Sequence, residues 1–318
     1  MFTLADAKQL SQDKLTNFVI DEFRKSPLLD ALPFDDTVKP QGGNSLTYSY
    51  NRVTTLPTAA GRAIGSEYTP QEAKTAKQNV DLKVFGGAFT LDRVIVTDET
   101  QVLDLVQFQI QQKSAAAVAL FADWFINGDS AADATAFDGL DKALTGSSTE
   151  LVLSTPLDMS SASAIEANWK AFLYNVRQAQ KLMQGAATVM PVNSDMFAIW
   201  KTVADYASAA TATKTDFGTE VVQYGPTLIM DMGDKPGTSN PIIANYTSGA
   251  DMVSDIYFAR LGLDAVHGVT PDGQKGPKVY VPNMKEPGAV KKGEVEMVAA
   301  MAMKATRAAA ALRGIKVA

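Results

Sequence analysis

Residues 102–129 read VLDLVQFQIQQKSAAAVALFADWFINGD. Apolar side chains such as Val106, Ile110 and Phe121 recur there at three- and four-residue spacing, which is typical of one face of a helix. Extended back to Asp98, the pattern predicts a single helix ending at Asn127, roughly 45 Å long at about 1.5 Å per residue. Gly128 is suited to end this helix in the left-handed conformation.

An apolar segment precedes this helix. The spacing of Leu15, Phe18 and Phe23 predicts a short amphipathic helix within residues 11–25, which Ser26–Pro27 ends. The following stretch contains prolines that cannot continue a helix, and its apolar members are Leu28, Leu29, Leu32 and Phe34. We expect this arm to dock on another surface, because so much apolar area needs cover.

Two alternating segments predict a β-ribbon. Leu46, Tyr48 and Tyr50 alternate with polar residues, and the same pattern returns between Val80 and Val84. The connection of roughly 24 residues is long for a compact domain, and a two-stranded ribbon is only marginally stable alone in water. We expect a neighbouring subunit to hold the ribbon; the alternative is a floppy surface loop.

The second half of the chain predicts helices and a mixed sheet. One helix is expected from Ser161 to Gln184, ended by Gly185, and another starts at Ser194, whereas residues 207–214 look like a loop. Short apolar runs between Gly and Pro predict strands at Val221–Tyr224, Leu228–Met230, Ile242–Ala244, Ile256–Ala259 and Lys278–Val281, and alternation returns from Val295 to Ala299.

Composition excludes several classes of function. The 318 residues include no cysteine, which removes disulfides and zinc–thiolate sites. The net charge of -6, without a basic block, disfavours sequence-specific nucleic-acid binding. No run of about 18 apolar residues and no signal peptide is evident, so we expect neither secretion nor a membrane span.

The sequence offers little for catalysis. His267 is the single histidine, which excludes two-histidine metal motifs and favours a structural role in its apolar context. No phosphate loop, dinucleotide motif or Gly-x-Ser-x-Gly elbow occurs. Asp129, Asp133, Asp138 and Asp141 lack calcium-loop spacing and are expected to satisfy a local turn. We therefore expect no enzyme, no cofactor and no metal.

Several segments resemble tailed-bacteriophage major capsid proteins with the Hong Kong 97 type of fold. The loop after the long helix carries the resemblance in Trp124–Asp129, Ala136–Leu140 and Leu144–Gly146. The arm from Leu4 to Phe34, the ribbon from Leu46 to Tyr68 and the ending from Arg307 to Ile315 are similar to the corresponding parts of one group of these proteins. Together these matches span nearly the whole chain in the correct order.

The resemblance implies an α+β Hong Kong 97-like capsid fold with five parts. These are an N-terminal arm (1–35), an extended loop with flanking strands (36–97), a peripheral domain with the spine helix (98–154), an axial domain (155–255) and a return to the peripheral domain (256–318). The candidate subunit-interface residues are Phe18, Phe23, Leu28, Leu29, Leu32, Phe34, Arg62, Glu67, Tyr68, Lys74 and Lys77.

The implied function is that of a major capsid protein. Such chains self-assemble as hexamers and pentamers into an icosahedral head that encloses double-stranded phage DNA without sequence preference. The implied partners are other copies of the chain, a separate scaffolding protein, a portal and a decoration protein, with no membrane. The implied location is the virion, after assembly in the bacterial cytoplasm.

Two other functions stay open at this point. An encapsulin-type nanocompartment shell has the same fold, and a cytoplasmic hydrolase using His267 is the alternative from a different class. Some members of the resembled family crosslink a loop lysine to an asparagine of a neighbour. Lys74 and Lys77 lie on the loop, but Asn283 has no clear match, so we expect no crosslinking.

Overall fold

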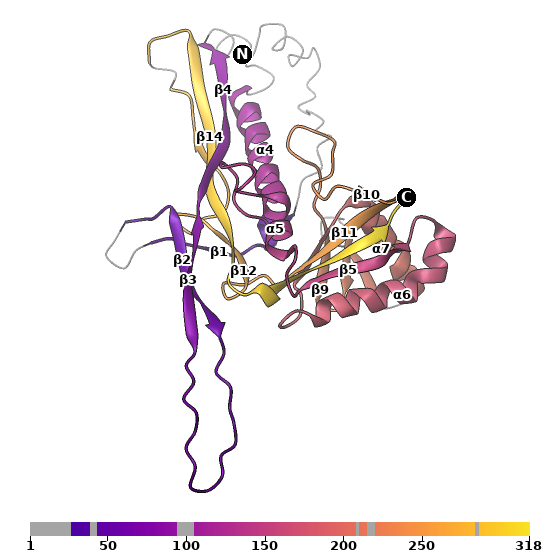
Figure 1. Ribbon diagram of the computed structural model, residues 1–318. Coiled ribbons are helices and arrows are strands. Elements are labelled where there is room, and N and C mark those ends of the chain that lie inside the picture. Colours follow the sequence, from indigo (N-terminus) through magenta and orange to yellow (C-terminus); the bar gives the residue numbers. More distant parts are fainter. Residues whose placement is uncertain (1–26, 39–42, 94–104, 208–209, 215–219, 284–285) are drawn as a thin grey trace.

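The computed structural model describes residues 27–38, 43–93, 105–207, 210–214, 220–283 and 286–318. Two sheets, each packed against helices, lie side by side, and a two-stranded ribbon projects from the body (Figure 1). The expected helix within residues 11–25, with Phe18 and Phe23, and the beginning of the long helix at 98–104 lie outside the described residues.

The first unit pairs the long helix with a five-stranded sheet. Helix α4 (Leu105–Asn127) confirms the described part of the predicted helix and buries Phe121 and Phe125. The sheet consists of β1 (Phe34–Asp35), β12 (Val266–Val269), β14 (Val290–Met303), β13 (Lys278–Tyr280) and β4 (Lys83–Asp92). β14 runs antiparallel to β4 from Val290 opposite Asp92 to Ala299 opposite Lys83.

The second unit is an eight-stranded sheet with two helices. Its strand order is β5 (Glu150–Asp158), β15 (Ala309–Lys316), β11 (Asp251–Ala259), β6 (Val189–Val192), β9 (Thr227–Asp231), β8 (Glu220–Tyr224) and β7 (Ala210–Lys214), with β10 (Tyr246–Ser248) paired to β11. β15 is parallel to β5 and β6 to β9, while the other pairs are antiparallel. The sheet is therefore mixed, as predicted.

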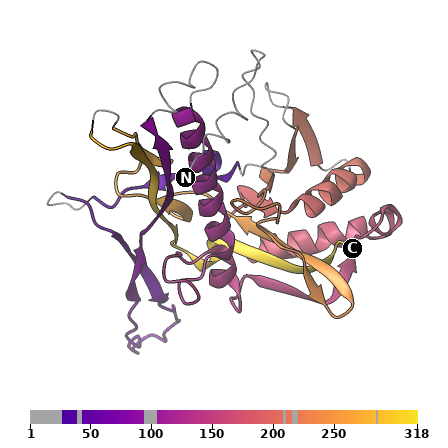
Figure 2. The ribbon, with the colours of Figure 1, turned by 90° about the horizontal axis from the view of Figure 1, so that it is seen from above.

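The helices of this unit share one core. α6 (Ala162–Lys181) begins at Ser161, whose hydroxyl accepts a hydrogen bond from the Ala164 N–H at 3.2 Å, a normal N-cap. α7 (Ser194–Ala207) contributes Trp200, which packs edge-on against Phe172 of α6 with ring centroids 4.9 Å apart. Both predicted helices are confirmed. Figure 2 shows the two helices together beside the sheet.

A loop of residues 128–139 joins α4 to the short helix α5 (Leu140–Leu144). The Gly139 N–H donates to the Gly128 carbonyl at 2.8 Å. A Cβ atom on Gly128 would lie 2.1 Å from the Phe137 carbonyl oxygen, and one on Gly139 would lie 2.5 Å from the Trp124 carbonyl oxygen. Gly128 does end the helix, but it is not among the positive-φ glycines; close backbone approach, and not the predicted left-handed conformation, requires glycine here.

The arm prediction is wrong for two residues. Leu28 and Leu32 are buried in the core of the first unit, at the two ends of the short helix α2 (Leu28–Ala31). Leu29 and Phe34 pack against the same core and stay half-buried. A Cβ atom on Gly268 would lie 2.4 Å from the Phe34 ring. This stretch finds its cover within its own chain.

Other predictions also need correction. Residues 210–214, expected in a loop, form β7, and Ile242–Ala244, expected as a strand, forms none, although Ile242 and Ile243 are buried. The segment 256–318 does not return as a whole to the first unit, because the end of β11 and all of β15 lie in the eight-stranded sheet. β5 begins before residue 155 and also belongs to that sheet.

Candidate assembly interface

The projecting ribbon contains no buried residue. β2 (Thr47–Thr55) and β3 (Lys74–Asp81) pair antiparallel with Tyr48 opposite Val80, which confirms the predicted ribbon. The segment predicted as one strand from Val80 to Val84 is divided between β3 and β4. Figure 1 shows the ribbon and its connecting loop extending well away from both units.

Backbone acceptors of β14 hold the base of the ribbon. The Tyr50 hydroxyl donates to the Met303 carbonyl at 2.8 Å. Arg52 donates from Nε to the Lys304 carbonyl at 3.0 Å and from Nη2 to the Met303 carbonyl at 2.6 Å. Because a guanidinium offers several donors in fixed directions, these contacts set the angle at which the ribbon leaves the body.

A polar cluster lies beside this anchor. The Tyr48 hydroxyl donates to Asp35 Oδ2 at 2.6 Å, and Lys304 Nζ lies 3.8 Å from the same oxygen. Burial opposes ionisation of Asp35, but the hydrogen bonds from Tyr48 and the Asp36 N–H outweigh it and lower the pKa of this carboxyl. Burial, and then the bond to Asp35, raises the pKa of the Tyr48 hydroxyl. The cluster is therefore a fixed charge pair with a neutral phenol.

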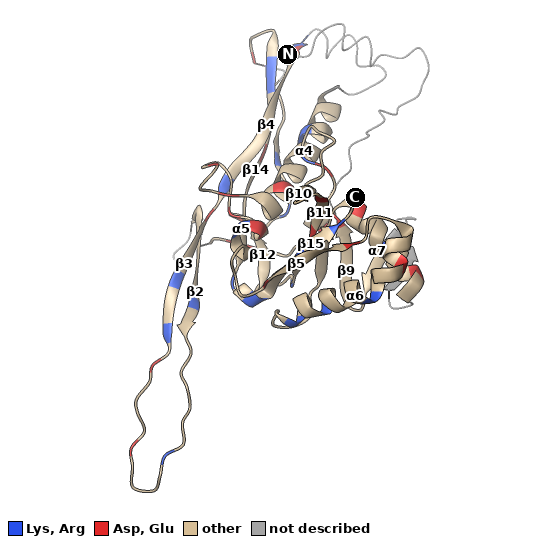
Figure 3. Cartoon of the chain, turned by 45° about the vertical axis from the view of Figure 1, so that its right-hand side comes forward, with Lys and Arg blue, Asp and Glu red and all other residues tan. Residues whose placement is uncertain are grey.

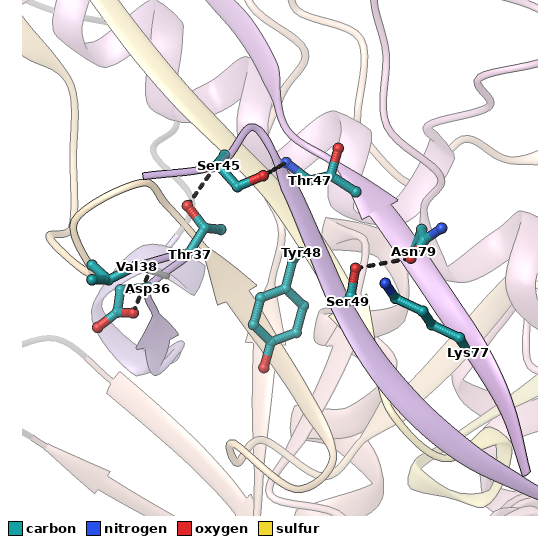
Figure 4. A pocket seen from close by; sticks show the side chains of 9 residues that line it. All are labelled: Asp36, Thr37, Val38, Ser45, Thr47, Tyr48, Ser49, Lys77 and Asn79. Atoms are coloured by element: carbon teal, nitrogen blue, oxygen red, sulfur yellow. Dashed lines mark hydrogen bonds between the residues drawn. The ribbon is translucent and has the colours of Figure 1, made fainter. Parts of the chain in front are cut away.

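An open pocket of about 600 Å³ lies along the ribbon base. Figure 4 shows its lining, which combines Asp36, Thr37 and Val38 with residues of the two ribbon strands. Ser49 and Asn79 bond across the strands at 2.8 Å, and Lys77 stands beside them. Among the residues that line this pocket, no nucleophile is paired with a base.

His267 lies in β12 and is fully buried. Its ring packs edge-on against Tyr48 at 5.6 Å, and neither ring nitrogen has a hydrogen-bond partner in the part of the chain that the structure describes. Burial, assisted by the positive charge of Lys304, lowers the pKa of this imidazole to about 4. The histidine is thus neutral at pH 7 and inaccessible to a substrate, which supports the structural interpretation.

The far end of the ribbon carries three of the predicted interface residues. Every residue from Val53 to Thr75 is exposed. The Arg62 guanidinium lies 5.3 Å from the centre of the Tyr68 ring, and Glu67 is adjacent. Leu56 is 78% exposed and Ile64 is fully exposed. Apolar side chains held this far from any core gain their burial only through another molecule.

Lys74 and Lys77 are exposed on β3. The structure thus places five predicted interface residues (Arg62, Glu67, Tyr68, Lys74 and Lys77) together on one ribbon, while Leu29 and Phe34 lie at the body. Sequence analysis missed Tyr50 and Arg52 as anchoring residues. Their acceptors are main-chain carbonyls about 250 residues away along the chain, and no sequence pattern signals such a contact.

A second missed residue, Arg313, joins the two units. Its guanidinium contacts Asp141 of α5 at 2.7 Å, Glu150 of β5 at 2.5 Å and Asp255 of β11 at 2.7 Å. Burial raises the pKa of Asp255, although the bonds from Arg313 and Tyr246 counter this effect. Because the Arg313 guanidinium contacts three carboxylates at once, it fixes α5 against the eight-stranded sheet, and its donors are already engaged within the chain.

Three of the four aspartates after α4 behave as predicted for a turn, whereas Asp141 binds the distant Arg313 and Tyr257 instead. Asp129 and Asp133 accept backbone N–H groups two residues ahead, at 2.9 and 2.8 Å. Asp138 accepts the Ser130 N–H at 2.8 Å and Lys142 Nζ at 2.9 Å. Among the described residues, no group of three or more His, Asp or Glu side chains is arranged to hold a metal ion.

Within the ranges described, no helix is long and apolar enough to cross a membrane.

Comparison with known proteins connects the chain to shell-forming folds. No protein-family model matches the sequence, and no curated protein matches it. Among solved structures, the holo-SrpI encapsulin complex from Synechococcus elongatus PCC 7942 matches with a TM-score of 0.66 at 12% identity, covering 99% of this chain and 96% of that one. The capsid of a native GTA particle matches with 0.63 at 9% identity, covering 96% of each chain.

A phage structure shows the same likeness. The Mycobacterium phage Ogopogo chain matches with a TM-score of 0.59 at 14% identity, covering 98% of this chain and 99% of that one. Coverage is near-complete in both directions, so the likeness extends over the whole fold and not over one part of it. The chain therefore has the Hong Kong 97-like fold of shell-forming proteins, as the resemblance implied.

Proposed function

We propose that this chain is the major capsid protein of a tailed bacteriophage. It assembles as hexamers and pentamers into an icosahedral head that encloses double-stranded DNA. The observation that carries the proposal is the ribbon, which is rigidly anchored at Tyr50 and Arg52 and wholly exposed beyond Val53. The solved structures of this fold include several phage capsids.

The energetics of the ribbon favour assembly. Isolated two-stranded ribbons are marginally stable in water, and this one exposes Leu56, Ile64 and Tyr68. Laying the tip over a neighbour buries these side chains at roughly 25 cal/mol per Å² of apolar area. Repeated around a ring, many such modest contacts add up to a stable closed shell.

The same proposal covers role, partners and location. The chain acts as a structural protein and not as an enzyme, and it needs no cofactor. Its partners are other copies of itself, a separate scaffolding protein, a portal and a decoration protein. It assembles in the host cytoplasm and remains in the virion.

Electron microscopy of the protein expressed alone and with its neighbouring genes tests the proposal. We expect closed isometric shells, or hexamer and pentamer rings. A matched variant replaces residues 56–73 with Asn-Gly, a two-residue hairpin turn, and keeps Tyr50 and Arg52. This variant should fold and fail to form shells, whereas a small uniform oligomer from the full chain under both conditions would overturn the proposal.

An encapsulin-type nanocompartment is the second candidate. The match to the holo-SrpI complex favours it, because that shell is similar over nearly the whole chain. Purified shells distinguish the two functions. A packaged enzyme without DNA would identify a nanocompartment, whereas scaffold, portal and DNA identify a phage head.

A hydrolase using His267 has no support in the geometry, since the ring is buried and lacks a nucleophile. Replacing His267 with alanine tests this: loss of a measurable hydrolase turnover in a folded variant would establish the enzyme.

A further inference from the structure

One face of α6 carries a stripe of three basic residues and one tyrosine. Lys170, Tyr174, Arg177 and Lys181 follow at four-, three- and four-residue spacing and are all exposed. Residues with this spacing lie along the same side of a helix. Glu166, four residues before Lys170, is the one acidic residue in the helix, so the three cations outnumber it on a chain whose net charge is -6. Figure 3 shows the basic segments recurring along α6.

The charges of the stripe are not neutralised by ion pairs. In the described ranges, none of Lys170, Arg177 and Lys181 lies within ion-pair distance of a carboxylate, although Lys170 lies 5.4 Å from the centre of the Trp169 ring. Ion pairs do form at Lys142, Lys235, Arg260, Lys278, Lys304, Arg313 and Lys316. Three free cations on one helix face mark a surface that lacks its counter-charge.

The Arg177 side chain is positioned to bind an anionic group. Its Nε donates to the Tyr224 hydroxyl at 2.7 Å, which fixes the side chain. The terminal nitrogens have no partner among the described residues, and Arg177 lines a pocket of about 440 Å³ together with Gln180, Tyr224 and residues 185–187 and 225–227. A guanidinium fixed in this way matches the geometry of a phosphate group.

The spacing of the three cations fits a polyanion such as duplex DNA better than a protein partner. At about 1.5 Å per residue, the cations lie roughly 10 and 6 Å apart along the helix, a span that reaches two or three phosphates of a duplex. Tyr174 is the one large exposed apolar residue of α6, whereas a protein partner would need an apolar centre.

We propose that the Lys170–Arg177–Lys181 stripe contacts the phosphate backbone of duplex DNA, which places this face of α6 toward the shell interior. The inference rests on the proposed capsid function and names the surface that meets the genome. Contacts to about three phosphates per subunit are weak at physiological salt. The contact therefore orders packed DNA without preventing its loading or ejection.

The test measures binding of the full-length, unassembled chain to a labelled 30-base-pair duplex by fluorescence anisotropy across a salt series. We expect the K170Q/R177Q/K181Q variant to bind at least tenfold more weakly at 50 mM salt, with the slope of log K against log salt smaller by about two to three. The control R62Q/K74Q/K77Q removes the same charge from the exposed ribbon and should stay within twofold of the unmodified chain.

Three outcomes decide the matter. Equal losses in both variants, or no loss in the stripe variant, would overturn the inference. Unchanged DNA binding combined with lost binding to poly-L-glutamate would overturn it in favour of an acidic protein partner. Electron microscopy of the same samples separates the two proposals: shells without stripe-dependent binding leave the capsid function intact, whereas stripe-dependent binding without shells removes only the capsid function.

Discussion

The Arg52 guanidinium donates to the carbonyl oxygen of Met303 at 2.6 Å, although 251 residues separate the two in the chain. The contact connects the ribbon to the end of the strand β14, which runs beside α4 in the first unit. Because the acceptor is a backbone group inside a sheet, it does not move with side-chain rotation. The ribbon is therefore oriented by the core, and its tip has a defined direction before any neighbour arrives.

Substituting Arg52 should impair assembly more than it impairs folding of the subunit. R52A loses charge-assisted hydrogen bonds, which costs about 2 kcal/mol of subunit stability, and it should strongly reduce the yield of closed shells in micrographs. R52K keeps the charge but not the fork of donors, so we expect a similar assembly defect. Normal shell yield from R52A would contradict the orienting role.

The turn after α4 should not tolerate a side chain at Gly139. In G139A the new Cβ atom would lie 2.5 Å from the Trp124 carbonyl oxygen, and relieving such overlap costs about 3 kcal/mol or more. Urea unfolding measures the loss. Gly61 has nothing within 4 Å of its ideal Cβ position, so G61A is the matched control and should change stability by less than about 0.5 kcal/mol.

The free energy of unfolding should fall in acid because His267 is protonated more readily in the unfolded chain. The folded-state pKa of about 4 lies below the ordinary value of 6.5, so the unfolded chain takes up the proton first as the pH falls. His267 therefore leaves the free energy of unfolding unchanged above about pH 7. As the pH drops from 6.5 toward 4, it lowers that free energy by about 3 kcal/mol. H267L should flatten this part of the curve in urea unfolding of unassembled subunits; an identical pH dependence in both proteins would contradict the assignment.

Boiled and denatured particles should give single-chain bands. Lys74 and Lys77 are exposed on the ribbon, but Asn283 bonds to Glu286 Oε1 at 3.0 Å within its own loop, and nothing in this chain marks it as the acceptor of a ribbon lysine. Denaturing gel electrophoresis of mature particles measures the outcome. A ladder of covalent multimers that disappears in K74R/K77R would overturn this expectation.

Sequence periodicity predicted the parts of the fold that have one buried face. The three long helices and the alternation in β14 all bury one stripe or one side, and such patterns are visible along a chain. β6 was missed because all four of its residues are buried, so it shows no alternation. β7 was missed because its small polar residues look like a loop.

Contacts between distant segments could not be predicted in the same way. Leu28 and Leu32 were correctly identified as needing cover, but periodicity does not say which surface provides it, and the core of the same chain does. The exposed ribbon residues could be anticipated because the connection is long and irregular. The anchor at Tyr50 and Arg52 could not, because its acceptors are main-chain carbonyls.

The position of β15 in its sheet bears on the order of events during synthesis. Residues 309–316 come last of the strands along the chain, yet they lie between β5 and β11 and complete the core with Ala310, Leu312 and Ile315. β5 has no other strand partner in the described sheet. A nascent chain still short of residue 309 cannot close this layer while it is on the ribosome. A polypeptide that stops before this strand leaves β5 unpaired and the core of the second unit open, so truncation near residue 309 should be read out directly as a folding defect.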